Sequence, residues 1–300
     1  MPMDCTLATC DHVRDLDPDD RVLLERLTMR GIKTSIAVWT DTGVDWAGTR
    51  LCVLRSTWDY HTRFNDFVHW IDRVARSTTV WNHPSLLKWS ADKAYLEELR
   101  LLGVPVVPTF FVKRGESADL KHIGEGHGWH EMVIKPARGS AAQNILRVKL
   151  SGAALECAQL HLDRLALSHG ALLQPYQKAV AAYGERALVF LGGHYSHAVV
   201  KKPFDTRMAV GDARCAVVQP TSEEIAVASN ALRLVPGQPI YARVDLLPGE
   251  GGEVFVNEVE LVEPALYLRV HDAAVTMFAD LIERQLTEIP MAAAQTVSAK

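Results

Sequence analysis

The stretch that decides the fold reads Tyr241-Ala-Arg-Val-Asp245, then Pro248-Gly-Glu-Gly-Gly252, then Val256-Asn-Glu-Val-Glu260. Side chains alternate faces along a strand, so Arg243 and Asp245 share one face of the first run. Glu258 and Glu260 share one face of the second run, roughly 6–7 Å apart along the strand. The glycine-rich turn predicts a hairpin that brings Asp245 close to Glu258.

Three carboxylates that meet on a partly buried sheet face repel one another, and this repulsion points to a bound cation. Asp245, Glu258 and Glu260 offer hard oxygen ligands, the type that Mg²⁺ prefers where a phosphate completes its coordination. The structural alternative is a solvated hairpin whose charges are incidental. The hairpin therefore predicts a magnesium site, with that alternative kept open.

A second motif joins a strand to a loop of small residues. Val133-Ile-Lys-Pro136 ends a predicted strand, and Ala137-Arg-Gly-Ser-Ala-Ala142 follows it. Small residues let backbone N–H groups approach an anion, and Lys135 adds a positive charge for phosphate. The spacing of a Walker loop is absent, and a solvated turn is the alternative interpretation.

Composition limits the classes of function. The chain has 300 residues, 48% of them hydrophobic, and a formal net charge of −4, which predicts two or three subdomains and no electrostatic footprint for nucleic acid or an anionic membrane. No apolar run reaches the ~20 residues of a membrane span. The N-terminus lacks the pattern of a signal peptide, and five scattered cysteines (Cys5, Cys10, Cys52, Cys157 and Cys215) fit free thiols. We therefore expect a cytoplasmic protein.

The first hundred residues alternate predicted strands with predicted helices, which indicates a doubly wound α/β domain. Strands are expected at 6–9, 36–39 and 51–54. Helices are expected from Asp17 to Gly31, over 67–74, and after a Ser90 cap with Leu96, Leu99 and Leu102 as its apolar stripe. Ligands bind beyond the carboxyl ends of such strands, so the candidate substrate residues are Thr9, Arg55, Thr57, Trp58 and Tyr60. Ordinary packing is the alternative for the aromatic residues.

The pattern changes after the proline-rich crossing at 103–108. Short strands are expected at 132–135, 145–148 and 171–174, with a helix near 152–168. Gly192-Gly193 predicts a second hairpin, between strands 185–191 and 195–201. A helix over 223–234 precedes the carboxylate hairpin, and a C-terminal helix is expected from about Pro264.

The order of these pieces resembles the ATP-grasp superfamily, in which two α+β lobes clasp ATP. The pieces are Lys93, Lys135 with its loop, Gln174-Pro-Tyr176, Gly184-Glu-Arg186, Arg243-Val-Asp245 and Asn257-Glu-Val-Glu260. The resemblance covers about residues 90–275 and implies an N-terminal pre-ATP-grasp domain over 1–88. It implies a central lobe over 89–178 and a C-terminal lobe with the metal hairpin over 179–300.

The resemblance also implies roles for single residues. Lys93 and Lys135 contact ATP phosphates, and Ser140 lies on a mobile loop above them. Gln174 to Tyr176 face adenine, and Glu185 reaches the ribose. Asp245, Glu258 and Glu260 hold Mg²⁺, with Mn²⁺ as a possible substitute, although many relatives carry Asn at the position of Glu260. Arg243, with Arg186 as a second catalytic arginine, stabilises an acyl phosphate or an oxyanion.

Three functions stay open at this point. The blocks at 55–60, 81–93 and 257–264 resemble cyclo-ligases of this superfamily in antibiotic biosynthesis, which convert O-ureido-D-serine to D-cycloserine with release of ADP, phosphate, CO₂ and NH₃. This implies an amino-acid-like small substrate, and a homodimer is possible. The second function is an intermolecular ligase that joins a carboxylate to the amine of an amino acid or peptide. The third is a nucleotide-binding module without turnover.

Overall fold

The computed structural model describes residues 3–140, 143–201 and 216–289. The chain forms two compact units: Met1–Pro84 with Glu263–Lys300, and Ser85–Val262. Four cysteines in the described ranges, Cys5, Cys10, Cys52 and Cys157, are free thiols, and Cys215 lies outside those ranges. None of the helices in these ranges combines the length and the apolar character that crossing a bilayer requires.

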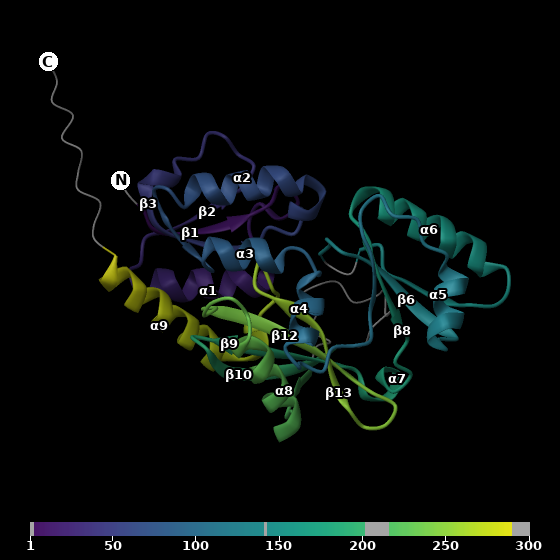
Figure 1. The fold of residues 1–300 in the computed structure, drawn as a ribbon. Helices are drawn as coiled ribbons and strands as arrows, with labels where there is room; N and C mark the ends of the chain where they lie inside the picture. Colours follow the sequence, from purple (N-terminus) through teal and green to yellow (C-terminus); the bar gives the residue numbers. More distant parts are fainter. Residues whose placement is uncertain (1–2, 141–142, 202–215, 290–300) are drawn as a thin grey trace, which may run out of the picture. The chain divides into compact units, whose positions relative to one another are not determined.

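A four-stranded parallel sheet, ordered β2-β1-β3-β4, forms the centre of the first unit. Its strands are β1 (Met3–Thr9), β2 (Thr34–Val38), β3 (Thr49–Ser56) and β4 (Thr79–Trp81). Its helices are α1 (Pro18–Met29), α2 (Phe64–Val74) and α9 (Asp272–Glu288). In Figure 1, α2 lies along one face of this sheet, and α1 and α9 lie along the other. The expected doubly wound arrangement is confirmed.

Local sequence signals account for these helices. The Asp17 side chain accepts a hydrogen bond from the Asp19 N–H and caps α1, whose first residue is Pro18. Gly31, with φ of 73°, follows the end of α1 in the left-handed region that favours glycine. The predicted apolar stripe of α2 is buried along its whole length, at Phe67, Trp70, Ile71 and Val74.

The C-terminal helix corrects two predictions. It begins at Asp272 and not near Pro264, and it belongs to the first unit, whereas the expected C-terminal lobe extended from 179 to 300. Ion pairs hold α9 on α1: Arg26 lies 2.6 Å from Asp272, and Arg30 lies 2.9 Å from Glu283. These partners are about 250 positions apart, a separation that local patterns cannot reveal.

The second unit contains two antiparallel sheets. The first, ordered β5-β8-β6-β7, comprises β5 (Phe110–Val112), β6 (Glu131–Pro136), β7 (Leu146–Lys149) and β8 (Ala171–Pro175). The second, ordered β11-β10-β9-β12-β13, comprises β9 (Glu185–Leu191), β10 (His194–Lys201), β11 (Ala216–Val218), β12 (Tyr241–Pro248) and β13 (Val254–Glu260). The helices are α3 (Pro84–Ser90), α4 (Tyr95–Leu101), α5 (Leu120–His127), α6 (Ala154–Ser168), α7 (Val180–Tyr183) and α8 (Ser222–Arg233).

Each sheet of this unit has its own apolar core. Leu162 and Leu165 of α6 pack with Ile134 of β6 under the first sheet. Ala228 and Leu232 of α8 pack under the second sheet, together with residues of β12 and β13. Both predicted hairpins are present, with β9 paired to β10 and β12 paired to β13. The fold therefore places the two sequence motifs on two separate sheets.

Ser90 has a different role from the predicted helix cap. It is the last residue of α3, and Ala94 precedes α4. Its hydroxyl donates to the Val259 carbonyl at 3.0 Å and accepts from the Leu261 N–H at 3.1 Å. The strand β13 lies at the edge of its sheet, so its outer backbone groups need partners, and Ser90 supplies two of them.

Candidate active site

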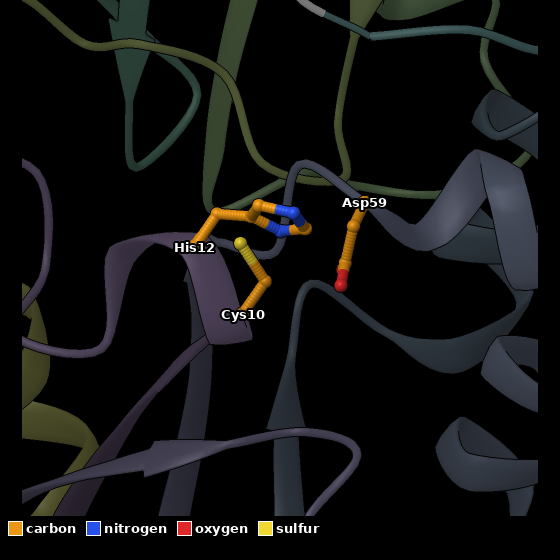
Figure 2. Close-up of side chains that lie close together, drawn as sticks. All are labelled: Cys10, His12 and Asp59. Atoms are coloured by element: carbon orange, nitrogen blue, oxygen red, sulfur yellow. The ribbon is translucent and has the colours of Figure 1, made fainter.

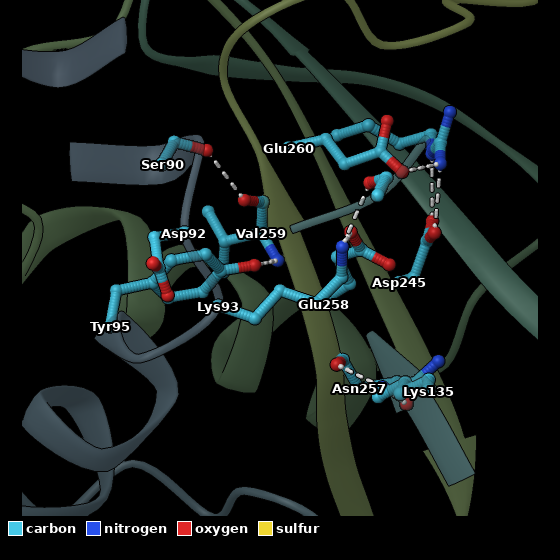
Figure 3. Close-up of polar contacts among 12 residues, drawn as sticks. Ser90, Asp92, Lys93, Tyr95, Lys135, Asp245, Asn257, Glu258, Val259 and Glu260 are labelled. Atoms are coloured by element: carbon cyan, nitrogen blue, oxygen red, sulfur yellow. Dashed lines mark hydrogen bonds and ion pairs between the residues drawn. The ribbon is translucent and has the colours of Figure 1, made fainter. Parts of the chain in front are cut away.

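The three predicted metal-binding carboxylates lie together on the β12–β13 hairpin. Asp245 pairs directly with Glu258 across the two strands, and Arg243 pairs with Glu260. One oxygen from each of Asp245, Glu258 and Glu260 lies within 4.8 Å of the others. Asp245 is buried, and the two glutamates are half-buried. Figure 3 shows this cluster with its polar contacts.

Basic side chains neutralise the cluster. Arg243 donates two hydrogen bonds to Asp245, at 2.8 and 2.9 Å, and a third to Glu260 at 2.5 Å. Lys201, at the end of β10, lies 2.6 Å from Asp245. Lys93 lies 2.9 Å from Glu258. Local sequence patterns do not reveal Lys201, because β11 and α8 separate it from Asp245 in the chain order and only the sheet, in which β9 lies between β10 and β12, brings the two side chains together.

The charges in the cluster shift the carboxyl pKa values in opposite directions. Burial favours neutral Asp245, but the charges of Arg243 and Lys201 outweigh it and hold the pKa of this carboxyl at about 2. Burial raises the pKa of Glu260 to about 7, since Glu258 and Asp245 add repulsion and Arg243 only partly offsets it. Mg²⁺ prefers oxygen ligands, and a bound cation would favour the ionised form of Glu260, so these three carboxylates fit Mg²⁺.

Lys135 connects the two sheets of the second unit. Its Nζ donates to the Asn257 side-chain oxygen at 2.9 Å, and the Asn257 amide donates to Glu185 at 3.0 Å. Burial lowers the pKa of Lys135 to about 8, and Lys93 adds to the shift. Lys93 also donates to the Gly139 carbonyl at 3.1 Å, on the small-residue loop. Both predicted phosphate lysines therefore lie beside the carboxylate hairpin.

The other predicted nucleotide residues lie on or after β6 and β8. The Gln174 amide donates to the Thr109 hydroxyl at 2.9 Å. The Arg147 guanidinium lies 3.5 Å from the centre of the Tyr176 ring. Ser140 is half-buried, and its carbonyl accepts from the Gln143 N–H at 3.2 Å. Residues 141 and 142 of the predicted loop lie outside the described residues.

The Arg186 side chain, which was predicted to be catalytic, lies away from the carboxylate cluster. Asp245 lies opposite Ala187 in the sheet, so the neighbouring Arg186 side chain points to the other face. There its guanidinium lies 4.2 Å from the centre of the Tyr183 ring, and its Nε lies 3.9 Å from Glu224. Glu224 belongs to the capping box of α8, so Arg186 contacts a structural element.

Comparisons with known proteins place this chain in a family. A family model described as D-cycloserine synthetase DcsG, N-terminal domain, matches residues 5–82. The cycloserine biosynthesis protein DcsG of Streptomyces lavendulae is 32% identical over 291 residues, which cover 90% of this chain and 95% of that protein. This chain belongs to the DcsG family. The crystal structure of D-cycloserine synthetase DcsG matches with a TM-score of 0.83 and 30% identity, over 94% of this chain and 99% of that one.

More distant structures show the same fold. The D-alanine–D-alanine ligase of Bacillus anthracis is 13% identical, with a TM-score of 0.61 over 95% of this chain and 99% of that one. The ATP-grasp ligase PsnB, in a structure with Mg and ADP, is 16% identical, with a TM-score of 0.65 over the same shares. The predicted ATP-grasp fold is confirmed, and this DcsG-family chain is an enzyme that forms C–N bonds.

In this DcsG-family chain, most of the predicted substrate residues of the first unit already contact other residues of the same unit. Arg55 is 1% exposed, pairs with Asp20 at 2.8 Å and donates to the Pro264 carbonyl at 2.7 Å. These contacts neutralise the charge of Arg55 inside the unit and favour a structural role for it. The Tyr60 ring packs 4.9 Å from the Phe67 ring, centre to centre, which is the packing role considered as the alternative.

The remaining candidates lie at the ends of β1 and β3. The Thr9 hydroxyl donates to the Val13 carbonyl at 2.6 Å. Trp58 is half-buried, and its carbonyl lies 3.0 Å from His61 Nδ1. Thr57 is buried, and its hydroxyl oxygen has no hydrogen-bond partner among the described residues. A buried hydroxyl without a partner costs free energy, so Thr57 remains the strongest substrate candidate of this loop.

Proposed function

We propose that this chain is an ATP-dependent cyclo-ligase that converts O-ureido-D-serine to D-cycloserine. The observation that carries the proposal is the cluster of three carboxylates on β12 and β13 with Lys93, Lys135 and Arg243 around it. The 32% identity to the cycloserine biosynthesis protein DcsG supports the choice of substrate. An acyl phosphate, made and consumed in one site, needs this concentration of positive charge.

The reaction has two stages. The substrate carboxylate attacks the γ-phosphorus of ATP, so an O–P bond forms and ADP leaves. The oxyamino nitrogen then attacks the acyl carbon, so a C–N bond closes the five-membered ring and phosphate leaves. Water removes the carbamoyl group as CO₂ and NH₃. Lys93 and Lys135 hold the phosphates, and Arg243 neutralises the oxyanion that develops at the acyl carbon.

In this proposal, one set of residues binds the metal and another binds the nucleotide. Asp245, Glu258 and Glu260 would hold Mg²⁺, or Mn²⁺ in its place, which screens the phosphate charge during transfer. Gln174 and Tyr176 flank the adenine, and Glu185 reaches the ribose. Ser140 belongs to the loop that covers the phosphates. In the first unit, Thr9, Thr57 and Trp58 are the candidates for contact with the amino-acid substrate.

A product assay tests the proposal. The protein is incubated with ATP, Mg²⁺ and O-ureido-D-serine, and ADP release and D-cycloserine are measured together, the second by mass spectrometry. We expect equal amounts of ADP and D-cycloserine, and none without Mg²⁺. ADP that forms only when a second amine is added would favour the intermolecular ligase. Nucleotide binding without ADP release under every condition would leave a binding module and overturn the proposal.

A further inference from the structure

A second group of side chains that could hold a metal ion lies in the first unit, and the proposed reaction does not use it. Cys10, His12 and Asp59 each offer one ligand atom, and the three atoms all lie within 4.8 Å of one another. Figure 2 shows the Cys10 sulfur beside the His12 ring, with Asp59 on a neighbouring loop. Cys10 is 1% exposed and His12 is exposed. A cation can therefore reach a buried sulfur from the surface.

The sheet topology places this group where ligands bind in α/β proteins. The chain leaves β1 for β2 on one side of the sheet and then crosses to β3 on the other. A crevice forms at the carboxyl ends of two strands where the order reverses in this way. Cys10 directly follows β1, and Asp59 is three residues after the end of β3. The two ligands thus flank the crevice from both strands.

The third strand, β2, holds one of the ligands in position. Trp39 follows β2, and its Nε1 donates to Asp59 Oδ1 at 2.7 Å. Metal-binding carboxylates commonly accept such a hydrogen bond on one oxygen, which fixes the orientation of the other. Asp11, the acidic residue between Cys10 and His12, is held by Arg14 and by Thr40. Asp59 is therefore the carboxylate of this crevice that is oriented toward Cys10 and His12.

We propose that Cys10, His12 and Asp59 bind a zinc-class divalent cation. Zn²⁺ binds cysteine sulfur, imidazole nitrogen and carboxylate oxygen, and three protein ligands leave its fourth position for water or another ligand. Mg²⁺ prefers oxygen ligands alone, so the carboxylates of the β12–β13 hairpin and this group select different metals. A bound cation also removes the repulsion between a Cys10 thiolate and the Asp59 carboxylate.

Cobalt provides a direct probe, because a thiolate bound to Co²⁺ gives a charge-transfer absorption that oxygen ligands do not give. The full chain is reduced, freed of metals by a chelator and titrated with Co²⁺ in excess Mg²⁺, which occupies the oxygen site. We expect one equivalent of Co²⁺ to produce the thiolate band and Zn²⁺ to displace it. A wild-type protein without this band would overturn the proposal.

Variants assign the band to these residues. Cys10→Ser should abolish it, and His12→Gln should weaken Co²⁺ binding ~10-fold or more, on the scale of disturbed metal sites. Matched controls are Cys157→Ser, an exposed thiol of α6, and His69→Gln, an exposed histidine of α2, and both should keep the wild-type affinity. An unchanged band in Cys10→Ser would disprove the site.

A stability measurement covers the case in which Cys10→Ser fails to fold. His12 is at the surface, so His12→Gln should fold normally. Zn²⁺ binds the folded state and should raise the melting temperature of the wild type, whereas His12→Gln should lose most of that increase. An equal increase in both proteins would place zinc elsewhere.

Discussion

Lys93 Nζ lies 2.9 Å from Glu258 Oε1, so a predicted phosphate ligand and a predicted metal ligand neutralise each other. Arg243 and Lys201 neutralise Asp245 in the same way. Buried charges need such partners, and removing one partner leaves the other without compensation. Binding of a metal and a nucleotide would exchange these partners, with the metal on the carboxylates and the phosphates on the lysines.

Glu258→Gln tests the metal assignment. The variant should fold, and its turnover should fall by ~10³ or more, because the metal that neutralises the transferred phosphoryl group loses a ligand. Steady-state ADP release at saturating substrate measures the effect. Glu250→Gln, an exposed carboxylate of the hairpin turn, is the control and should keep normal turnover. Near-normal turnover in Glu258→Gln would remove the carboxylates from the reaction.

Lys135→Met tests the nucleotide assignment. The substitution keeps most of the packing of the stem and removes the charge, so the Kd for ATP should rise ~10-fold or more, as for a lost charged contact. Calorimetry measures this Kd. Lys149→Met, an exposed lysine at the end of β7, is the control and should bind ATP normally. An unchanged Kd in Lys135→Met would give that lysine a structural role alone.

The same lysine predicts a pH dependence of ATP binding. Burial lowers the pKa of Lys135 to about 8 in the free protein, and only the charged form attracts phosphate. Affinity should therefore be constant below pH 8 and fall by up to ~10-fold per pH unit above it, until the pKa of the complex is reached. Lys135→Met should lack this decrease, so a decrease of equal size in both proteins would assign it to another group.

Arg55→Ala should affect stability more than substrate specificity. Asp20 would become an uncompensated buried charge, so unfolding free energy should fall by about 3–5 kcal/mol, and the KM values for both substrates should rise together. Thermal and chemical denaturation measure the loss, and adding Asp20→Asn should restore part of it. Arg73→Ala, at an exposed position of α2, is the control. A selective rise in the KM of the amino-acid substrate, with normal stability, would return Arg55 to the substrate site.

Asp19 predicts a pH-dependent contribution to stability. Burial, with repulsion from Asp20, raises its pKa from 3.8 to about 6. The folded state therefore binds the proton more tightly than the unfolded chain does, and this contribution decreases as the pH rises from about 4 to about 6. Asp19→Asn keeps the oxygen that accepts from the Arg269 N–H and removes the ionisation.

The difference in unfolding free energy between Asp19→Asn and the wild type measures this contribution. Between pH 4 and pH 6 the unfolding free energy of the variant should rise by up to ~3 kcal/mol relative to that of the wild type, and the difference should be constant above that range. Asp15→Asn, an exposed carboxylate before α1, is the control and should show a much smaller change. A constant difference across the range would mean that Asp19 ionises normally.

Local patterns were sufficient for the elements that depend on near neighbours in the chain. The two hairpins follow from glycines beside alternating strands, and α1 follows from Asp17 and Pro18. The resemblance carried by Lys93, Lys135 and the β12–β13 carboxylates indicated the fold that the comparisons confirm. Ser90 was assigned wrongly as a helix cap, because its hydroxyl bonds the backbone of Val259 and Leu261, about 170 positions away. The face that Arg186 shares with its neighbours depends on the register of β9 against β12, which the local sequence does not give.

By itself, the sequence determined the ATP-grasp family and placed Arg243 beside Asp245, because alternation along one strand is a local property of the backbone. Only the tertiary structure decided that Lys201 reaches Asp245, that Arg55 is neutralised by Asp20, and that Cys10 meets Asp59. These contacts join residues 35 or more positions apart. The order of the strands and the packing of the elements that follow them determine these contacts, and for Lys201 and Asp245 a shift of one residue in register would turn the side chain to the opposite face.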